Sequence, residues 1–192
     1  MTAIRERLEN IFSTEGSDEF CPKWKLFAET SDHTFKLIEP PLTAEQICLK
    51  GKMNCYAYAL ELYKLPSYSR WVDDERYLYC QINVLTGRVF GGLIEQGLLA
   101  EIPDADVTVN SLVVYISGDN ITHCGTIIRD NKRVRSKFNI KEFYEHGLME
   151  VRTSFGFPTK YLKRPTYKER LKIMASLAKL PPFRGDMSDQ RP

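Results

Sequence analysis

Apolar residues recur at the spacing of one helix face in five parts of the chain. These segments are residues 2–11, 43–49, 52–65, 84–99 and 166–178. Thr43 and Thr166 stand where N-caps are expected, whereas Gly51 and Pro66 end the second and third segments. The last helix is expected to present one apolar face, formed by Leu171, Met174, Ala175 and Ala178.

Three runs rich in β-forming residues lie in the second half of the chain, at residues 111–116, 121–128 and 133–138. The turn-forming residues between them predict an antiparallel meander. Shorter strands are expected at 35–38, 148–151 and 160–163, and one helical turn at 141–146. The pattern predicts a single α+β domain over residues 1–180, with a disordered tail at 181–192.

Composition agrees with a folded domain and argues against two classes of partner. The chain of 192 residues is 43% apolar and 27% charged, and its net charge is +2 with both signs scattered, so nucleic-acid binding is not favoured. No apolar run reaches the roughly 20 residues that span a bilayer, and the N-terminal residues alternate charged with apolar side chains. We therefore expect no membrane association, and a cytoplasmic location or delivery by a signal-independent secretion route.

The cysteine and histidine spacings predict neither a disulfide framework nor a metal site. Five cysteines are an odd number, they are widely spaced, and none forms a C-x-x-C pair. The three histidines make no H-x-x-x-H spacing either. We expect no metal and no cofactor.

Cys55 is the first candidate for chemistry. It falls in the first turn of a predicted helix, after Asn54 as a plausible cap, where unpaired backbone N–H groups and the helix dipole favour an anion. That position lowers a thiol pKa, and the same N–H groups suit the oxyanion of a tetrahedral intermediate. The alternative is that Cys55 is a small buried core residue, as most free cysteines are.

His123 is the second candidate. It lies in a predicted strand two residues before Gly125, on the same face, and Gly125 leaves room beside the imidazole. Cys124 is expected to point to the other face, as a core residue. A structural histidine remains the alternative for His123.

The order of these segments resembles the NlpC/P60 and CHAP branches of the papain-like superfamily. The segment Asn54-Cys-Tyr-Ala-Tyr-Ala59 is similar to the nucleophile helix of CHAP domains, and Thr122-His-Cys-Gly-Thr-Ile127 to their histidine strand. Ser136-Lys-Phe-Asn139 and Glu145-His-Gly-Leu148 resemble segments of an uncharacterised bacterial family within that group. The resemblance covers somewhat more than half the chain. It implies a papain-like fold in which the helix with Cys55 packs on a small antiparallel sheet that carries His123.

The resemblance also implies a thiol hydrolase, in which Cys55 attacks an amide carbonyl and His123 acts as general base and then general acid. His146 or Asn139 would orient the imidazole, since a protonated Lys137 cannot accept a hydrogen bond. A peptide, peptidoglycan or a protein would be the substrate. Two alternatives stay open: an acyltransferase that uses the same pair, and a non-catalytic binding or immunity module.

Overall fold

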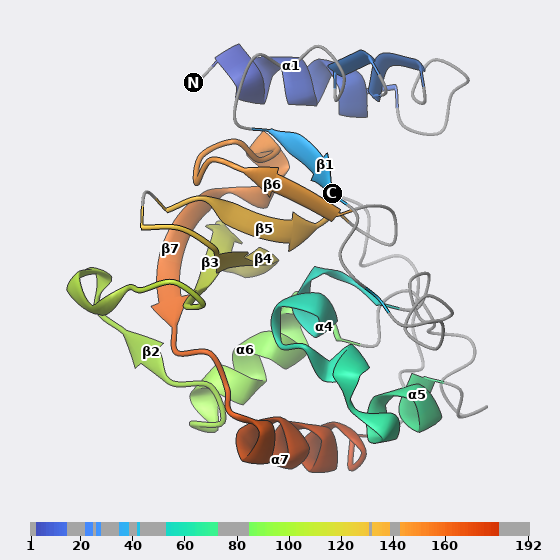
Figure 1. Cartoon of the computed structure of the whole chain (residues 1–192), viewed down its shortest axis with the longest axis vertical. Coiled ribbons are helices and arrows are strands. Elements are labelled where there is room, and N and C mark those ends of the chain that lie inside the picture. Colours follow the sequence, from blue (N-terminus) through green and yellow to red (C-terminus); the bar gives the residue numbers. More distant parts are fainter. Residues whose placement is uncertain are drawn as a thin grey trace.

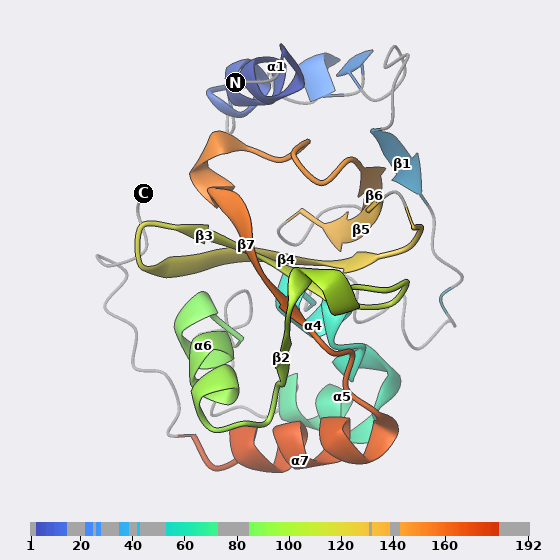
Figure 2. The same ribbon diagram turned by 90° about the vertical axis from the view of Figure 1, so that its left-hand side faces the viewer.

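A computed structural model describes residues 3–14, 22–24, 26–27, 35–38, 42, 53–72, 85–130, 132–138 and 143–180. It is a mixed α+β structure in three layers (Figures 1 and 2). A single sheet forms the middle layer, helix α1 lies on one side, and the helices α4, α5, α6 and α7 lie on the other. The expected α+β class is confirmed.

The sheet has seven strands, and every neighbouring pair is antiparallel. Its spatial order is β1-β6-β5-β4-β3-β7-β2, so the predicted meander forms its centre and β7 returns to pair with β3. The strands are β1 Lys36–Ile38, β2 Glu101–Ile102, β3 Leu112–Ser117, β4 Asn120–Ile127, β5 Val134–Lys137, β6 Phe143–His146 and β7 Phe157–Leu162.

The α-helices are α1 Ala3–Phe12, α4 Cys55–Ala59, α5 Pro66–Val72, α6 Gly87–Glu95 and α7 Tyr167–Leu177. Short 3₁₀ turns occupy Leu62–Lys64, Asp104–Asp106 and Thr153–Phe155. The predicted cap of the last helix is present, because Thr166 and Glu169 form a reciprocal capping box. No helix in the described part of the chain is long and apolar enough to cross a membrane.

The predicted continuous helix from residue 52 to Pro66 is wrong. It stops after Ala59, because Glu61 adopts a left-handed conformation with φ of 54°. The Glu61 carboxylate then forms ion pairs with Lys64, Arg164 and Arg170. A new helix, α5, begins at Pro66, the residue at which the predicted helix was expected to end.

Three further expectations need correction. Residues 143–146 form strand β6 rather than a helical turn, because they pair with β1 and β5. Residues 148–151 form a turn instead of a strand. In α7 the buried side chains are Ile173, Met174 and Leu177, whereas Leu171 is exposed. The helix expected at 43–49 and the tail at 181–192 lie outside the described residues.

Each face of the sheet has its own apolar cluster. One cluster joins α4, α6 and α7 to Leu112, Val114, Cys124 and Leu162 of the sheet. The other joins Leu8, Ile11 and Phe12 of α1 to Val113, Tyr115, Ile127 and Val134. Because successive residues of a strand point to opposite faces, the position of a side chain along β3 or β4 decides which cluster it enters.

Candidate functional site

Cys55 is the first residue of α4, as the sequence predicted. The Asn54 side chain caps this helix: its carbonyl oxygen accepts from the backbone N–H of Ala57 at 3.1 Å. Its amide nitrogen donates to the carbonyl of Leu85 at 2.8 Å, which ties the start of α4 to the residues before α6. The cap therefore fixes where the Cys55 thiol lies.

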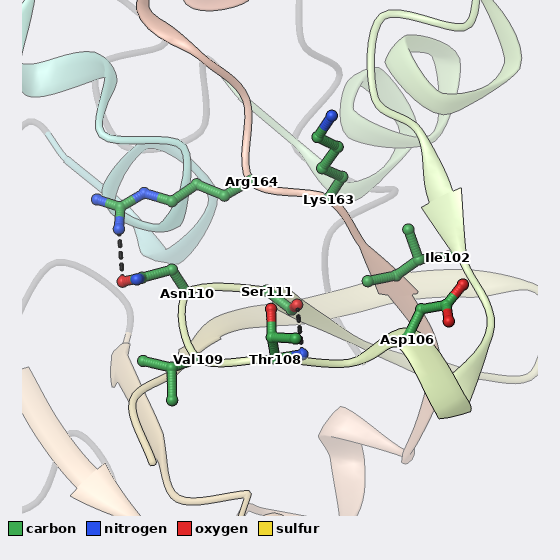
Figure 3. Close-up of a pocket in the computed structure, with 8 residues that line it drawn as sticks. All are labelled: Ile102, Asp106, Thr108, Val109, Asn110, Ser111, Lys163 and Arg164. Carbon is green, nitrogen blue, oxygen red and sulfur yellow. Dashed lines mark hydrogen bonds between the residues drawn. The ribbon is translucent and has the colours of Figure 1, made fainter. Parts of the chain in front are cut away.

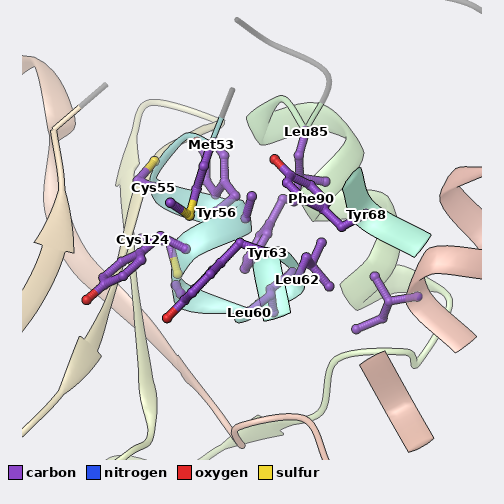
Figure 4. Packing of buried hydrophobic residues seen from close by; sticks show 14 of the residues in the cluster. Met53, Cys55, Tyr56, Leu60, Leu62, Tyr63, Tyr68, Leu85, Phe90 and Cys124 are labelled. Atoms are coloured by element: carbon purple, nitrogen blue, oxygen red, sulfur yellow. The ribbon is translucent and has the colours of Figure 1, made fainter. Parts of the chain in front are cut away.

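The Cys55 thiol is buried between α4 and the sheet, with 6% of the residue exposed (Figure 4). Burial raises its pKa to about 12. The backbone N–H groups of Cys124, Tyr56 and Cys55 itself act in the opposite direction. The charge of Lys137 also lowers this pKa, but burial dominates. The thiol is therefore protonated at neutral pH.

Cys124 faces the same helix. It is fully buried. The two thiols are close enough that a negative charge on Cys55 would raise the pKa of Cys124. Burial is the larger cause of that rise. The prediction that Cys124 is a core residue is confirmed.

His123 lies on the opposite face of the sheet from Cys55. It pairs with Tyr115 across β3 and β4, next to the pair of Val114 with Cys124. Since Cys124 points toward α4, the neighbouring His123 points away from it. The structure thus does not bring Cys55 and His123 together, and the predicted nucleophile–base pair is not formed.

Aromatic rings enclose the His123 imidazole. It stacks on Phe155 with ring centroids 4.3 Å apart and planes at 12°, and it contacts Tyr115 and Phe138 at 5.5 and 5.3 Å. Its Nε2 has no hydrogen-bond partner among the described residues. Burial, and then the neighbouring His146, hold the pKa of His123 well below its usual value. The ring is neutral and only 1% exposed.

His146 shares this face but does not orient His123. Its Nδ1–H donates to the carbonyl of Gly147 at 2.8 Å, and its Nε2 accepts from the Ser136 hydroxyl at 2.8 Å. A carbonyl only accepts, so Nδ1 must carry the proton. Both ring nitrogens are occupied, and the Phe138 ring contacts both imidazoles. His146 is therefore a satisfied buried histidine, with a pKa that burial lowers to about 4.

The neighbouring residues of β5 point to alternate faces of the sheet, as strand geometry requires. Ser136 faces His146, and Lys137 faces the opposite side, where its Nζ lies 5.6 Å from the Phe143 ring centroid. Lys137 is fully buried near Cys55. Asn139 lies outside the described residues.

A surface pocket of about 380 Å³ is lined by residues that belong to neither cluster (Figure 3). Arg164 donates to the Asn110 side-chain oxygen at 2.6 Å across it, and the Ser111 hydroxyl accepts from the Thr108 N–H at 3.0 Å. None of its lining residues belongs to α4 or β4. They are Ile102, Asp106, Thr108, Val109, Asn110, Ser111, Lys163 and Arg164.

The described residues contain no group of three or more His, Cys, Asp or Glu side chains that could hold a metal ion. What sequence reasoning missed is the aromatic enclosure of His123 by Phe138 and Phe155, which come from two later segments. No spacing signal links these residues to His123. The sequence predicted that His123 and Cys124 lie on opposite faces of the strand. It did not predict which of the two faces α4.

The geometry defines an α+β protein with a buried cysteine at a helix start and a buried histidine across the sheet from it. Comparison of the chain with protein-family models, with curated proteins and with solved structures found no significant match.

Proposed function

We propose that this chain is a non-catalytic binding module on a papain-like scaffold, in which Cys55 and His123 are packing residues. The observation that carries the proposal is their placement on opposite faces of one sheet. General base catalysis requires hydrogen-bond reach between the base and the thiol, directly or through one water. Strand β4 itself stands between the two side chains.

The protonation states of Cys55 and His123 also support a non-catalytic role. A thiol whose pKa is raised by burial to about 12 is almost entirely protonated at neutral pH. The reactive form of cysteine is the thiolate, so Cys55 is a poor nucleophile in this environment. His123 is neutral and could accept a proton. Its Nε2, however, is buried among aromatic rings, where a substrate has no access.

Support for the scaffold comes from the order of the elements. Helix α4, which begins at Cys55, precedes β3, then β4 with His123, and then β5 in the chain, with α5, α6 and β2 between α4 and β3. This is the order that the resemblance to NlpC/P60 and CHAP domains implies. One scaffold hosts many functions, so the scaffold does not by itself require catalysis.

A thiol hydrolase or acyltransferase is the second candidate. It is favoured by the backbone N–H groups of Cys124, Tyr56 and Cys55, which interact with the sulfur and lower the thiol pKa; N–H donors of this kind can also stabilise an oxyanion. Such an enzyme would cleave an amide bond of a peptide, peptidoglycan or protein through an acyl-enzyme. It would need a different pairing of β4 to bring His123 to Cys55.

Alkylation by iodoacetamide separates the two candidates. The rate at Cys55 is followed by mass spectrometry as a function of pH, in the native chain and in His123→Phe, which keeps an aromatic ring in the enclosure. We expect slow modification in both proteins, at a rate that rises only when urea unfolds the chain. Rapid modification at neutral pH, with an apparent pKa well below about 8.5 that His123→Phe abolishes, would establish the catalytic pair instead.

A further inference from the structure

The C-terminal helix α7 presents an exposed face that combines apolar and basic side chains. Tyr167 and Leu171 lie one helical turn apart and are 56% and 41% exposed. Exposed lysines follow each of them, at Lys168 and Lys172. We call this the α7 face, formed by Tyr167, Lys168, Leu171, Lys172 and Ala175 of the helix and by Lys179 just beyond its end.

The α7 face is not needed to attach the helix to the domain. The opposite side of α7 does this, because Ile173, Met174 and Leu177 are buried in the cluster that also contains α4. The capping box at Thr166 fixes the start of the helix. Figure 1 shows α7 as the outermost element on its side of the sheet. The face is therefore rigidly held and points outward.

Positive charge is concentrated around this helix. Residues 163–179 hold six basic side chains and one acidic one, a net +5, whereas the whole chain carries +2. Arg164 and Arg170 form ion pairs with Glu61. The lysines of the α7 face make no ion pair with described residues. Glu169, the single acidic residue, is engaged with the Thr166 N–H and hydroxyl.

We propose that the α7 face is the docking surface for an acidic protein partner, whose groove has an apolar floor and a rim of Asp and Glu side chains. This inference rests on the proposed binding function. Tyr167 and Leu171, at i and i+4, are the apolar anchors of a helix that enters a groove. The guanidinium carbon of Arg170 lies over the Tyr167 ring, 5.9 Å from its centroid, and this contact restrains the anchor before binding. The lysines supply charge complementarity at the rim.

The same face is poorly suited to a membrane or to nucleic acid. Insertion into a lipid interface requires a broad apolar helix face, and α7 already buries Ile173, Met174 and Leu177 in the core. The exposed apolar groups that remain are one tyrosine, one leucine and alanines. Phosphate binding would use the lysines but would leave Tyr167 and Leu171 in water, and it needs no apolar anchors.

Site-specific photo-crosslinking tests the proposal on the full chain. The aromatic cross-linker p-benzoylphenylalanine replaces Tyr167, and as a matched control it replaces Phe157 of β7, which is 61% exposed. Each protein is irradiated in extract of the organism that encodes it, and the cross-linked peptides are sequenced by mass spectrometry. The experiment is repeated with Lys168→Glu and Lys172→Glu combined, and at high salt.

We expect the Tyr167 position to yield one dominant adduct, on a peptide with Asp or Glu beside apolar residues. Its yield should fall severalfold in the double-glutamate variant and at high salt, and Phe157 should not produce it. Adducts with lipid or nucleic acid, adducts that survive charge reversal, or a yield no higher than at Phe157 would each overturn the proposal. The alkylation of Cys55 is independent of this outcome. If Cys55 is unreactive and no adduct forms at position 167, the module binds through another surface. If Cys55 is reactive, the binding function itself is refuted.

Discussion

Acid should destabilise this protein through two buried histidines, His123 and His146. His146 has a folded-state pKa of about 4, against an ordinary value of 6.5, because burial disfavours its charged form. The unfolded chain therefore binds more protons than the native state between these two values. Stability is fully present above about pH 6.5 and is lost as the pH falls toward 4.

The size of this effect follows from the shift. The interval from 6.5 to about 4 corresponds to roughly 3 kcal/mol, of which about 2 kcal/mol is lost between about pH 7 and pH 5. His123 adds a contribution of the same sign, because burial and His146 also lower its pKa. The pair should make the free energy of unfolding fall steeply over a range in which exposed carboxylates have not yet titrated.

Urea unfolding followed by tryptophan fluorescence at a series of pH values measures this slope. His146→Phe removes one titrating group and should flatten the slope by about 2 kcal/mol over the same interval. Ile173→Ala, in the cluster on the other face, lowers stability by about 2–5 kcal/mol but should leave the slope unchanged. An unchanged slope in His146→Phe would refute the reasoning, since it would mean that His146 is hydrated or already charged in the native state.

Three further predictions concern stability, each measured by urea unfolding. Gly87→Ala should cost more than about 2 kcal/mol, because the new methyl group would lie 1.7 Å from a carbonyl oxygen of β4. Gly92→Ala in the same helix should stabilise the chain by up to about 1 kcal/mol. Equal effects would contradict the close approach of α6 to β4. Thr166→Ala removes the cap of α7 and should cost about 1 kcal/mol, and no loss would mean that the capping box is not formed in solution. His123→Phe replaces a buried nitrogen that has no partner among the described residues, and it should be neutral or stabilising by about 1 kcal/mol. His146→Phe breaks two hydrogen bonds and should cost about 2 kcal/mol. The reverse order would show that His123 has a partner.

The sequence predicted correctly the elements whose ends are set by a capping residue or a turn-forming residue. The cap at Asn54 fixed the start of α4, Thr166 fixed the start of α7, and the turn residues separated β3, β4 and β5. The features that were missed depend on contacts between distant segments. The break at Glu61 is held by Arg164 and Arg170, more than a hundred residues away in the sequence.

Strand β6 was missed for a related reason. Residues 143–146 read Phe-Tyr-Glu-His, which shows no regular alternation of apolar and polar side chains, and the span is too short to distinguish a strand from a helical turn. Pairing with β5 on one side and β1 on the other decides the outcome. Likewise, Leu171 fits the helical periodicity as well as Ile173 does, and only the direction in which α7 meets the core leaves Leu171 outside.

The choice between enzyme and binding module depends on the pairing of one strand. A shift of one residue in β4 would turn His123 toward α4 and Cys124 away from it, because side chains alternate along a strand. Two contacts oppose that shift: the Thr122 hydroxyl donates to the carbonyl of Phe155 at 2.6 Å, and the Tyr56 hydroxyl donates to the carbonyl of Ile121 at 2.9 Å.

Gly125 opposes the shift more strongly. It sits where a Cβ would lie 2.4 Å from Val134, so only glycine fits at this position of the pairing with β5. A one-residue shift would move Cys124 or Thr126, each with a side chain, into that space. The glycine that the sequence suggested as room for a catalytic imidazole therefore acts, in this structure, to fix the pairing that keeps the imidazole away from Cys55.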